Sequence, residues 1–204
     1  GQIVPPHDHG IIQEVRGVEG PNAVRWGKDE SSQSRIHITT SAVDEAYLQT
    51  VTDLRMDQNL IENGSDLPIV YTPLHGTGSV SVIPALAQAG FRNVHIVESQ
   101  RIPDGNFPTV HSPNPEEGAA LSAAIELARE VNAQLVLGTD PDSDRVGIAV
   151  PDAKASGGWR LLNGNETGAL LVDYVVNGRA ANGTLKPGFD FVAKTIVTSD
   201  LMAE

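Results

Sequence analysis

Residues 135–145 read LVLGTDPDSDR, an apolar run followed by Asp140, Asp142, Asp144 and Arg145. Residues spaced by two point the same way in an extended turn, so the three carboxylates are expected to converge. Three anions about 5 Å apart repel by roughly 3 kcal/mol per pair at an effective dielectric near 20. A bound divalent cation would remove that repulsion, and hard oxygen ligands favour magnesium, calcium or manganese over zinc.

Strand-like and helix-like segments alternate around this stretch. Alternation of this kind predicts an α/β layered domain with a mainly parallel, mixed sheet flanked by helices. In such sheets ligand loops lie at the carboxyl ends of strands, which is where the aspartates fall. The expected strands are residues 68–72, 94–97, 135–137 and 146–150, and the expected helices are residues 44–63, 79–89 and 116–131.

The pattern predicts three parts along the chain. Residues 1–42 are rich in Pro, Gly and polar side chains and are interpreted as a connector or the remnant of a preceding domain. Residues 43–165 form the main domain. Residues 166–204 are expected to begin a second, incomplete α/β unit, with a helix over 167–176 and a strand over 189–197. Because there is no initiator Met, both ends look cut from a longer chain.

Composition excludes several classes of function. The formal charge of −12 and the pI of about 4.8 argue against nucleic acid and anionic membranes as main partners. The absence of cysteine removes disulfides and thiol catalysis. No apolar run approaches the ~18 residues of a membrane span, and no signal peptide is evident at the start. A cytoplasmic location is therefore expected.

Known acidic loops differ in how well they fit. An EF-hand loop needs glycine at its sixth position and glutamate at its twelfth, where this chain has Arg145 and Pro151, so that interpretation fails. A haloacid-dehalogenase-type phosphatase motif has Thr or Val in the place of Asp144, which makes that alternative weak. Residues 140–145 resemble the Asp-x-Asp-x-Asp-Arg metal loop of the α-D-phosphohexomutases (the phosphoglucomutase/phosphomannomutase family) at every fixed position. A solvated acidic turn would explain neither the preceding strand nor the arginine.

The resemblance extends along nearly the whole chain and is weakest over residues 16–36. The order and spacing of the matching segments agree with a central piece of such a mutase, covering its second domain and the start of its third. The matching segments are residues 3–8 (IVPPHD), 71–78 (YTPLHGTG), 104–108 (DGNFP), 113–116 (PNPE), 164–171 (GNETGALL) and 194–198 (KTIVT).

This resemblance implies an enzyme that moves a phosphoryl group between O1 and O6 of a hexose through a bisphosphate. A phosphoserine of the first domain would be the donor and Mg²⁺ the cofactor. It implies that Asp140, Asp142 and Asp144 are the metal ligands, that Arg145 lies at the active site and that Lys194 is an acid/base. The chain has no match to the serine, sugar or phosphate loops of the family. The sugar and the oligomeric state therefore stay open, and a non-catalytic metal-binding or interaction domain of the same fold is the alternative.

Two further segments invite a functional interpretation. Residues 111–115 (HSPNP) look like the family's catalytic serine loop, but the order differs and Pro113 follows Ser112, so we interpret them as the proline-rich loop of the second domain. Residues 75–78 (HGTG) are either a phosphate cradle or a tight strand-to-helix turn, in which His75 could hold the loop through hydrogen bonds. His7 and His9 are expected in a solvated leader.

Overall fold

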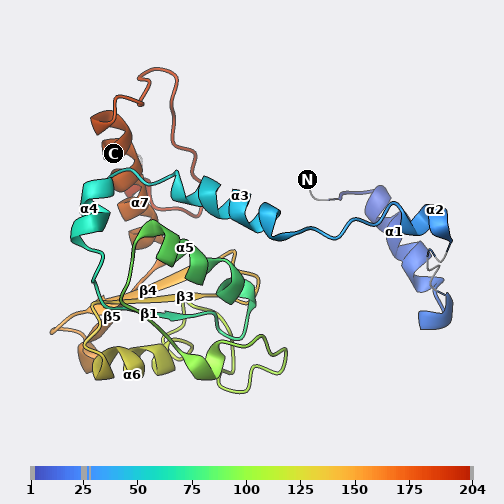
Figure 1. The fold of residues 1–204 in the computed structure, drawn as a ribbon, viewed down its shortest axis with the longest axis horizontal. Coiled ribbons are helices and arrows are strands. Elements are labelled where there is room, and N and C mark those ends of the chain that lie inside the picture. Colours follow the sequence, from blue (N-terminus) through green and yellow to red (C-terminus); the bar gives the residue numbers. More distant parts are fainter. Residues whose placement is uncertain (1–2, 24–26, 28, 203–204) are drawn as a thin grey trace. The chain divides into compact units, whose positions relative to one another are not determined.

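In the computed structural model the described residues are 3–23, 27 and 29–202, and the chain divides into two compact units, Gly1–Thr40 and Ser41–Glu204 (Figure 1). The first unit contains α1 (His7–Arg16), the 3-10 turn η1 (Pro21–Ala23) and the short α2 (Glu30–Gln33). Its irregular composition did not predict α1. Asp8 in the first turn and Arg16 in the last turn suit the helix dipole, although every side chain of α1 is at least partly exposed.

The second unit is an α/β domain built on a mixed five-stranded sheet, which confirms the predicted fold class. The strand order is β2-β1-β3-β4-β5, with β1 parallel to both β2 and β3 and the β3–β4 and β4–β5 pairs antiparallel. The strands are β1 (Ile69–Thr72), β2 (Val94–Ile96), β3 (Leu135–Thr139), β4 (Val146–Pro151) and β5 (Trp159–Leu162). The helices are α3 (Ser41–Thr52), α4 (Gln58–Asn63), α5 (Val82–Ala89), α6 (Ser122–Glu130) and α7 (Gly164–Ala181), and the 3-10 turns are η2 (Thr77–Val80), η3 (Glu98–Gln100), η4 (Ser156–Gly158) and η5 (Asp200–Met202).

Helices cover both faces of the sheet. The chain passes from β1 through α5 to β2 and then returns past β1, through α6, to β3. Figure 1 shows α5 and α6 on opposite faces, as crossovers of one hand running in opposite directions require. The direction of winding therefore reverses between β1 and β3. The loops that leave the carboxyl ends of these two strands border the crevice where α/β sheets bind ligands.

The core is aliphatic, as the low aromatic content indicates. All four residues of β1 are buried, which is expected of a central strand covered on both faces. Between the sheet and α6 lies a cluster of small and branched side chains: Val70, Val97, Leu121, Ala124, Ala128, Ala133, Val136 and Ala149. None of the described helices is both long and apolar enough to cross a membrane.

Three expected elements differ from the structure. The helix over 44–63 is two helices, because the chain turns and restarts where the Asp57 side chain caps α4 by accepting a hydrogen bond from the amide of Leu60. The helix over 116–131 is limited to α6, since the residues before Ser122 form turns after the buried Pro115. The expected strand over 189–197 does not form. Among the described residues β5 is the last strand of the sheet, and a strand without a neighbouring strand leaves its backbone hydrogen bonds unmade.

The last helix, α7, has a complete N-terminal cap and rests on the connection between α3 and α4. Asn163 accepts a hydrogen bond from the amide of Glu166, whose carboxylate accepts one from the amide of Asn163. The Tyr174 hydroxyl accepts from the amide of Met56, and Asn182 donates to the Met56 carbonyl. These contacts attach α7 to the edge of the α/β domain.

Candidate metal centre

The aspartate loop, residues 140–145, begins where β3 ends. Asp140 is only 1% exposed, whereas Asp142 and Asp144 face solvent. Ser143 adopts a left-handed conformation (φ 60°) and its amide donates to the Asp140 carbonyl at 3.0 Å, which closes a tight turn. Each of the three aspartates offers a carboxylate oxygen, and these oxygens all lie within 4.8 Å of one another.

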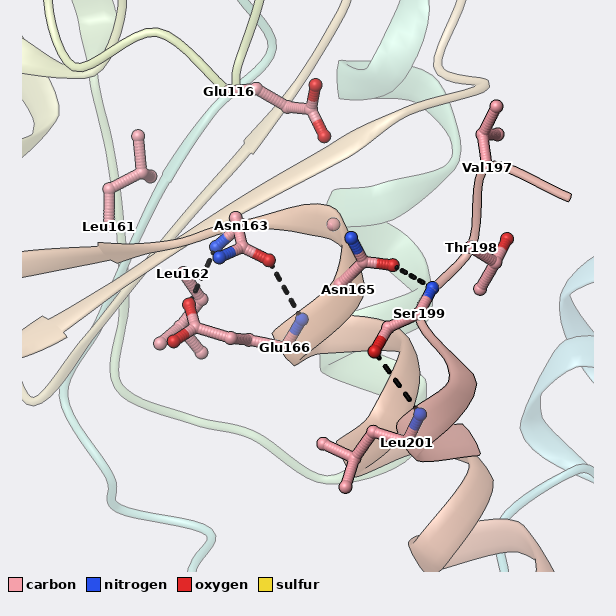
Figure 2. A pocket seen from close by; sticks show the side chains of 11 residues that line it. Glu116, Leu161, Leu162, Asn163, Asn165, Glu166, Val197, Thr198, Ser199 and Leu201 are labelled. Atoms are coloured by element: carbon pink, nitrogen blue, oxygen red, sulfur yellow. Dashed lines mark hydrogen bonds between the residues drawn. The ribbon is translucent and has the colours of Figure 1, made fainter. Parts of the chain in front are cut away.

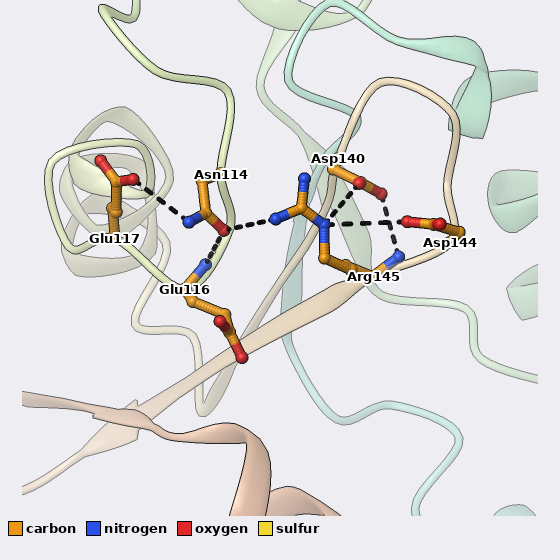
Figure 3. A network of polar contacts seen from close by, with 6 residues as sticks. All are labelled: Asn114, Glu116, Glu117, Asp140, Asp144 and Arg145. Atoms are coloured by element: carbon orange, nitrogen blue, oxygen red, sulfur yellow. Dashed lines mark hydrogen bonds and ion pairs between the residues drawn. The ribbon is translucent and has the colours of Figure 1, made fainter. Parts of the chain in front are cut away.

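Arg145 holds the buried carboxylate of this loop. Its amide donates to Asp140 Oδ1 at 3.0 Å and its Nε donates to Asp140 Oδ2 at 2.8 Å (Figure 3). Burial by itself opposes ionisation of Asp140, but the two hydrogen bonds from Arg145 outweigh it and the pKa of Asp140 is lowered. The same pairing raises the pKa of the guanidinium. Asp140 is therefore a fixed anion.

The two exposed carboxylates, Asp142 and Asp144, lie close to Asp140 and to each other. The pKa of Asp144 is raised, first by its hydrogen bond with Asp140 and then by repulsion from Asp142 and Asp140. The Arg145 Nε lies 3.7 Å from Asp144 Oδ1 and offsets only part of this. Three hard oxygen donors with uncompensated charge are the donor set that Mg²⁺ or Mn²⁺ prefers. The buried Ser143 hydroxyl has no hydrogen-bond partner among the described residues.

The proline-rich loop, residues 103–115, reaches the aspartate loop through Asn114. Its Oδ1 accepts from Arg145 at 3.4 Å and from the amide of Glu116 at 3.2 Å, while its Nδ2 donates to Glu117 (Figure 3). The loop can come this close because residue 147 is glycine: a Cβ there would lie 2.0 Å from the Pro115 carbonyl oxygen. Sequence reasoning missed Asn114, because a contact over 31 positions leaves no local pattern.

The β1 loop, residues 73–78, is a packed turn rather than an open phosphate cradle. Its amides at Gly76 and Thr77 donate to the Pro73 and Pro141 carbonyls, so neither points at a ligand. His75 is buried, and its Nε2 forms a 2.8 Å hydrogen bond with the Thr109 hydroxyl. This geometry agrees with a holding role for His75.

Lys194 and Ser112 lie away from the aspartate loop's hydrogen bonds. The Lys194 ammonium pairs with Asp200 at 2.7 Å and donates to the Thr198 carbonyl, and no described contact joins it to residues 140–145. The Ser112 hydroxyl donates to Glu117 at 3.0 Å. The structure therefore brings Asp140, Asp142, Asp144 and Arg145 together without Lys194. His7 and His9 lie on α1 and belong to no metal-type cluster of the described residues.

A pocket of about 900 Å³ lies at the N-terminus of α7 (Figure 2). Two glutamates, Glu116 and Glu166, border it, and Asn165 accepts a hydrogen bond from the amide of Ser199 across it. No Lys or Arg is among its lining residues. The cations beside it are already paired: Arg160 bonds the Glu166 carboxylate, and the Lys194 ammonium bonds Asp200 and the Thr198 carbonyl. None of its lining residues belongs to the aspartate loop.

The fold and the acidic loop together define an α/β/α domain in which three carboxylates converge at the strand-order reversal. Residues 45–156 match the family described as phosphoglucomutase/phosphomannomutase, alpha/beta/alpha domain II. That match covers more than half of the chain, and the chain therefore belongs to this family.

Two curated relatives agree with this assignment. The whole chain is 37% identical to a protein of Haemophilus influenzae named "Probable phosphomannomutase", of which it covers 39%. Over 70% of its length it is 46% identical to a phosphoglucomutase of Staphylococcus epidermidis, of which it covers 25%. A solved structure of a phosphoglucomutase/phosphomannomutase family protein from Burkholderia thailandensis superposes with a TM-score of 0.48 at 19% identity, over 66% of this chain and 26% of that one. The chain thus spans less than two fifths of the length of these relatives.

Proposed function

We propose that this chain supplies the metal-binding domain of a phosphohexomutase that converts a hexose 1-phosphate to the 6-phosphate through a bisphosphate. The single observation that carries the proposal is the convergence of three carboxylates, braced by Arg145, at the carboxyl end of β3. In this proposal residues 43–165 are the second domain, residues 1–42 precede it as the end of the first, and residues 166–204 begin the third. The substrate is a phosphosugar, and the enzyme acts in the cytoplasm.

Asp140, Asp142 and Asp144 would hold Mg²⁺, because their oxygens are hard donors within mutual reach. When bound, the ion stabilises negative charge on the phosphoryl group in transfer. Arg145 keeps Asp140 ionised through two hydrogen bonds and brings a second cation to the same place. Lys194 would move a proton at the sugar hydroxyl, and the serine that carries the phosphate would come from the first domain.

Titration calorimetry with Mn²⁺ and Mg²⁺ tests the metal assignment on this chain. Asp142→Asn keeps the size of an exposed side chain and removes one anionic ligand, so affinity should fall by at least about tenfold. Asp53→Asn is the matched control. Asp53 is also exposed, but it lies just after α3 and is not one of the three clustered aspartates. Equal heats for wild type and Asp142→Asn would overturn the assignment. A mutase assay of a protein that joins these residues to the remaining domains separates catalysis from metal binding alone.

A further inference from the structure

The β1 loop and the aspartate loop meet at Pro141, which lies between two of the three carboxylates. The Thr77 amide donates to the Pro141 carbonyl at 2.8 Å, and the Thr77 hydroxyl donates to the same oxygen at 3.1 Å. Gly76 packs against the same residue: a Cβ at this position would lie 2.2 Å from the Pro141 Cα and 2.5 Å from its carbonyl oxygen. The carbonyl that accepts both bonds belongs to the peptide that leads into Asp142. Its orientation is therefore fixed from outside the aspartate loop.

The β1 loop has an unfavourable backbone conformation that the surrounding structure maintains. Leu74 and His75 both have left-handed backbones, with φ of 46° and 61°, which is costly for a leucine. The strain persists because Leu74 is fully buried, the His75 amide donates to the Gln100 carbonyl at 2.9 Å, and the His75 carbonyl accepts from the amide of Asp104 at 3.0 Å. Surrounding structure thus determines where Thr77 points.

A hydrogen-bonded chain of side chains supports this turn from beneath. Gln100 is completely buried; its Oε1 accepts from the Thr72 hydroxyl at 2.6 Å and its Nε2 donates to the Thr109 hydroxyl at 2.9 Å. Thr109 also bonds the His75 ring, and Thr72 accepts from the amide of Leu74. A buried amide with both ends satisfied is a rigid support, because breaking either bond leaves a polar group unpaired.

We propose that the β1 loop is a clamp for the aspartate loop and that Thr77 is its positioning residue. The clamp fixes the Pro141–Asp142 peptide so that the three carboxylates are already gathered before a cation arrives. Gathering like charges is unfavourable, and a loop free to relax would separate them. Preorganisation of this kind raises affinity by removing the cost of ordering the ligands on binding. The effect on metal affinity rests on the proposed function, whereas the effect on the loop itself does not.

The test uses a matched pair of substitutions in this chain. Thr77→Val keeps the shape and loses the hydroxyl, and Thr77→Ser keeps the hydroxyl. Thr77 is exposed, so the loss of one hydrogen bond in Thr77→Val should lower the melting temperature by only a few degrees, and Thr77→Ser should melt like wild type. Amide hydrogen exchange measured by NMR without metal should accelerate at Ser143 and Arg145 by roughly 2- to 12-fold in Thr77→Val, as the loss of one hydrogen bond implies. Thr77→Ser should exchange like wild type.

Binding of Mn²⁺, followed by electron paramagnetic resonance, is the second readout. Thr77→Val should bind about tenfold more weakly, the size expected of an outer-shell partner. Wild-type exchange at Ser143 and Arg145 in Thr77→Val would overturn the clamp. So would exchange that is faster by the same factor across the whole sheet, because that result marks a general loss of stability. If the exchange result holds but the wild-type chain binds no Mn²⁺, the clamp stands and the proposed metal function fails.

Discussion

The end of the sheet that carries the aspartate loop and the segment that follows α7 are built in opposite ways. Asp140 is buried, receives two hydrogen bonds from Arg145 and follows a strand paired on both sides. Lys194 lies in a segment without strand pairing, two residues before Ile196, which is 99% exposed. A site at the carboxyl end of a central strand inherits its geometry from the domain core. The segment after α7 joins no strand of the sheet among the described residues, so the role of Lys194 depends on which part of the protein packs against that segment.

The largest expected effect is on turnover, and it comes from Lys194, the residue outside the sheet. In a mutase that contains these residues with the remaining domains, Lys194→Ala should lower turnover by roughly 10²–10⁴-fold, as expected of a lost acid/base, without lowering the melting temperature. Asp200→Asn is the control: it removes the ion-pair partner of Lys194 seen here and should leave turnover within a few-fold of wild type. Near-wild-type turnover in Lys194→Ala, or an equal loss in both variants, would contradict the catalytic role.

A second prediction concerns the packing of the β1 loop against the aspartate loop. Gly76→Ala places a Cβ against the Pro141 backbone, which cannot move as a flexible side chain can. Overpacking of this kind costs about 1–3 kcal/mol, and each kcal/mol lowers the melting temperature by roughly 2–4 °C in a domain of this size. Thermal denaturation followed by circular dichroism measures it. Gly105→Ala, where a Cβ would meet nothing within 4 Å, should melt like wild type. An unchanged melting temperature in Gly76→Ala would show that the two loops are not packed as described.

The features that the sequence predicted are those encoded locally. The Asp140–Arg145 pattern follows an apolar strand, so its place at the carboxyl end of a strand could be inferred from the local sequence alone. The support for that site could not be inferred, because His75 and Thr109 are 34 positions apart and meet only in the folded chain. The failed expectations have the same origin. Branched and aromatic residues over 189–197 are typical of a strand, but strand formation requires a partner that local sequence does not reveal.

A smaller effect on the melting temperature is expected from the N-terminal cap of α7. The pKa of Glu166 is lowered, mainly by the hydrogen bond from the Asn163 amide and also by Arg160. A depressed carboxyl pKa contributes stability above the ordinary value of 4.5, and this stability is lost as the pH falls through the folded value. Glu166→Gln should therefore melt slightly lower than wild type at neutral pH, and the difference should vanish in acid.

Asn163→Ala is the comparison for that helix cap. It removes a cap worth about 1 kcal/mol, and because asparagine does not titrate, its effect should not depend on pH in the same way. Differential scanning calorimetry from neutral to acidic pH distinguishes the two. A Glu166→Gln deficit that is constant across the range would show that the carboxylate's charge is irrelevant to the cap.

The smallest expected effect is none at all: this chain by itself should take up no phosphoryl group from a radiolabelled hexose bisphosphate, even with Mg²⁺. Transfer needs a nucleophile, a metal beside it and cations that grip the remote phosphate, since binding energy from that phosphate positions the reacting oxygen. The lining of the pocket at the N-terminus of α7 includes Glu116 and Glu166 and no Lys or Arg, and the neighbouring Arg160 is paired with Glu166. Ser112 is the serine whose neighbours look most like the family's catalytic serine loop. Its hydroxyl donates a hydrogen bond to Glu117, and Pro113 follows it. Stoichiometric labelling that disappears in Ser112→Ala would show that the proline-rich loop carries a nucleophile and that the aspartate loop serves a site complete within this chain.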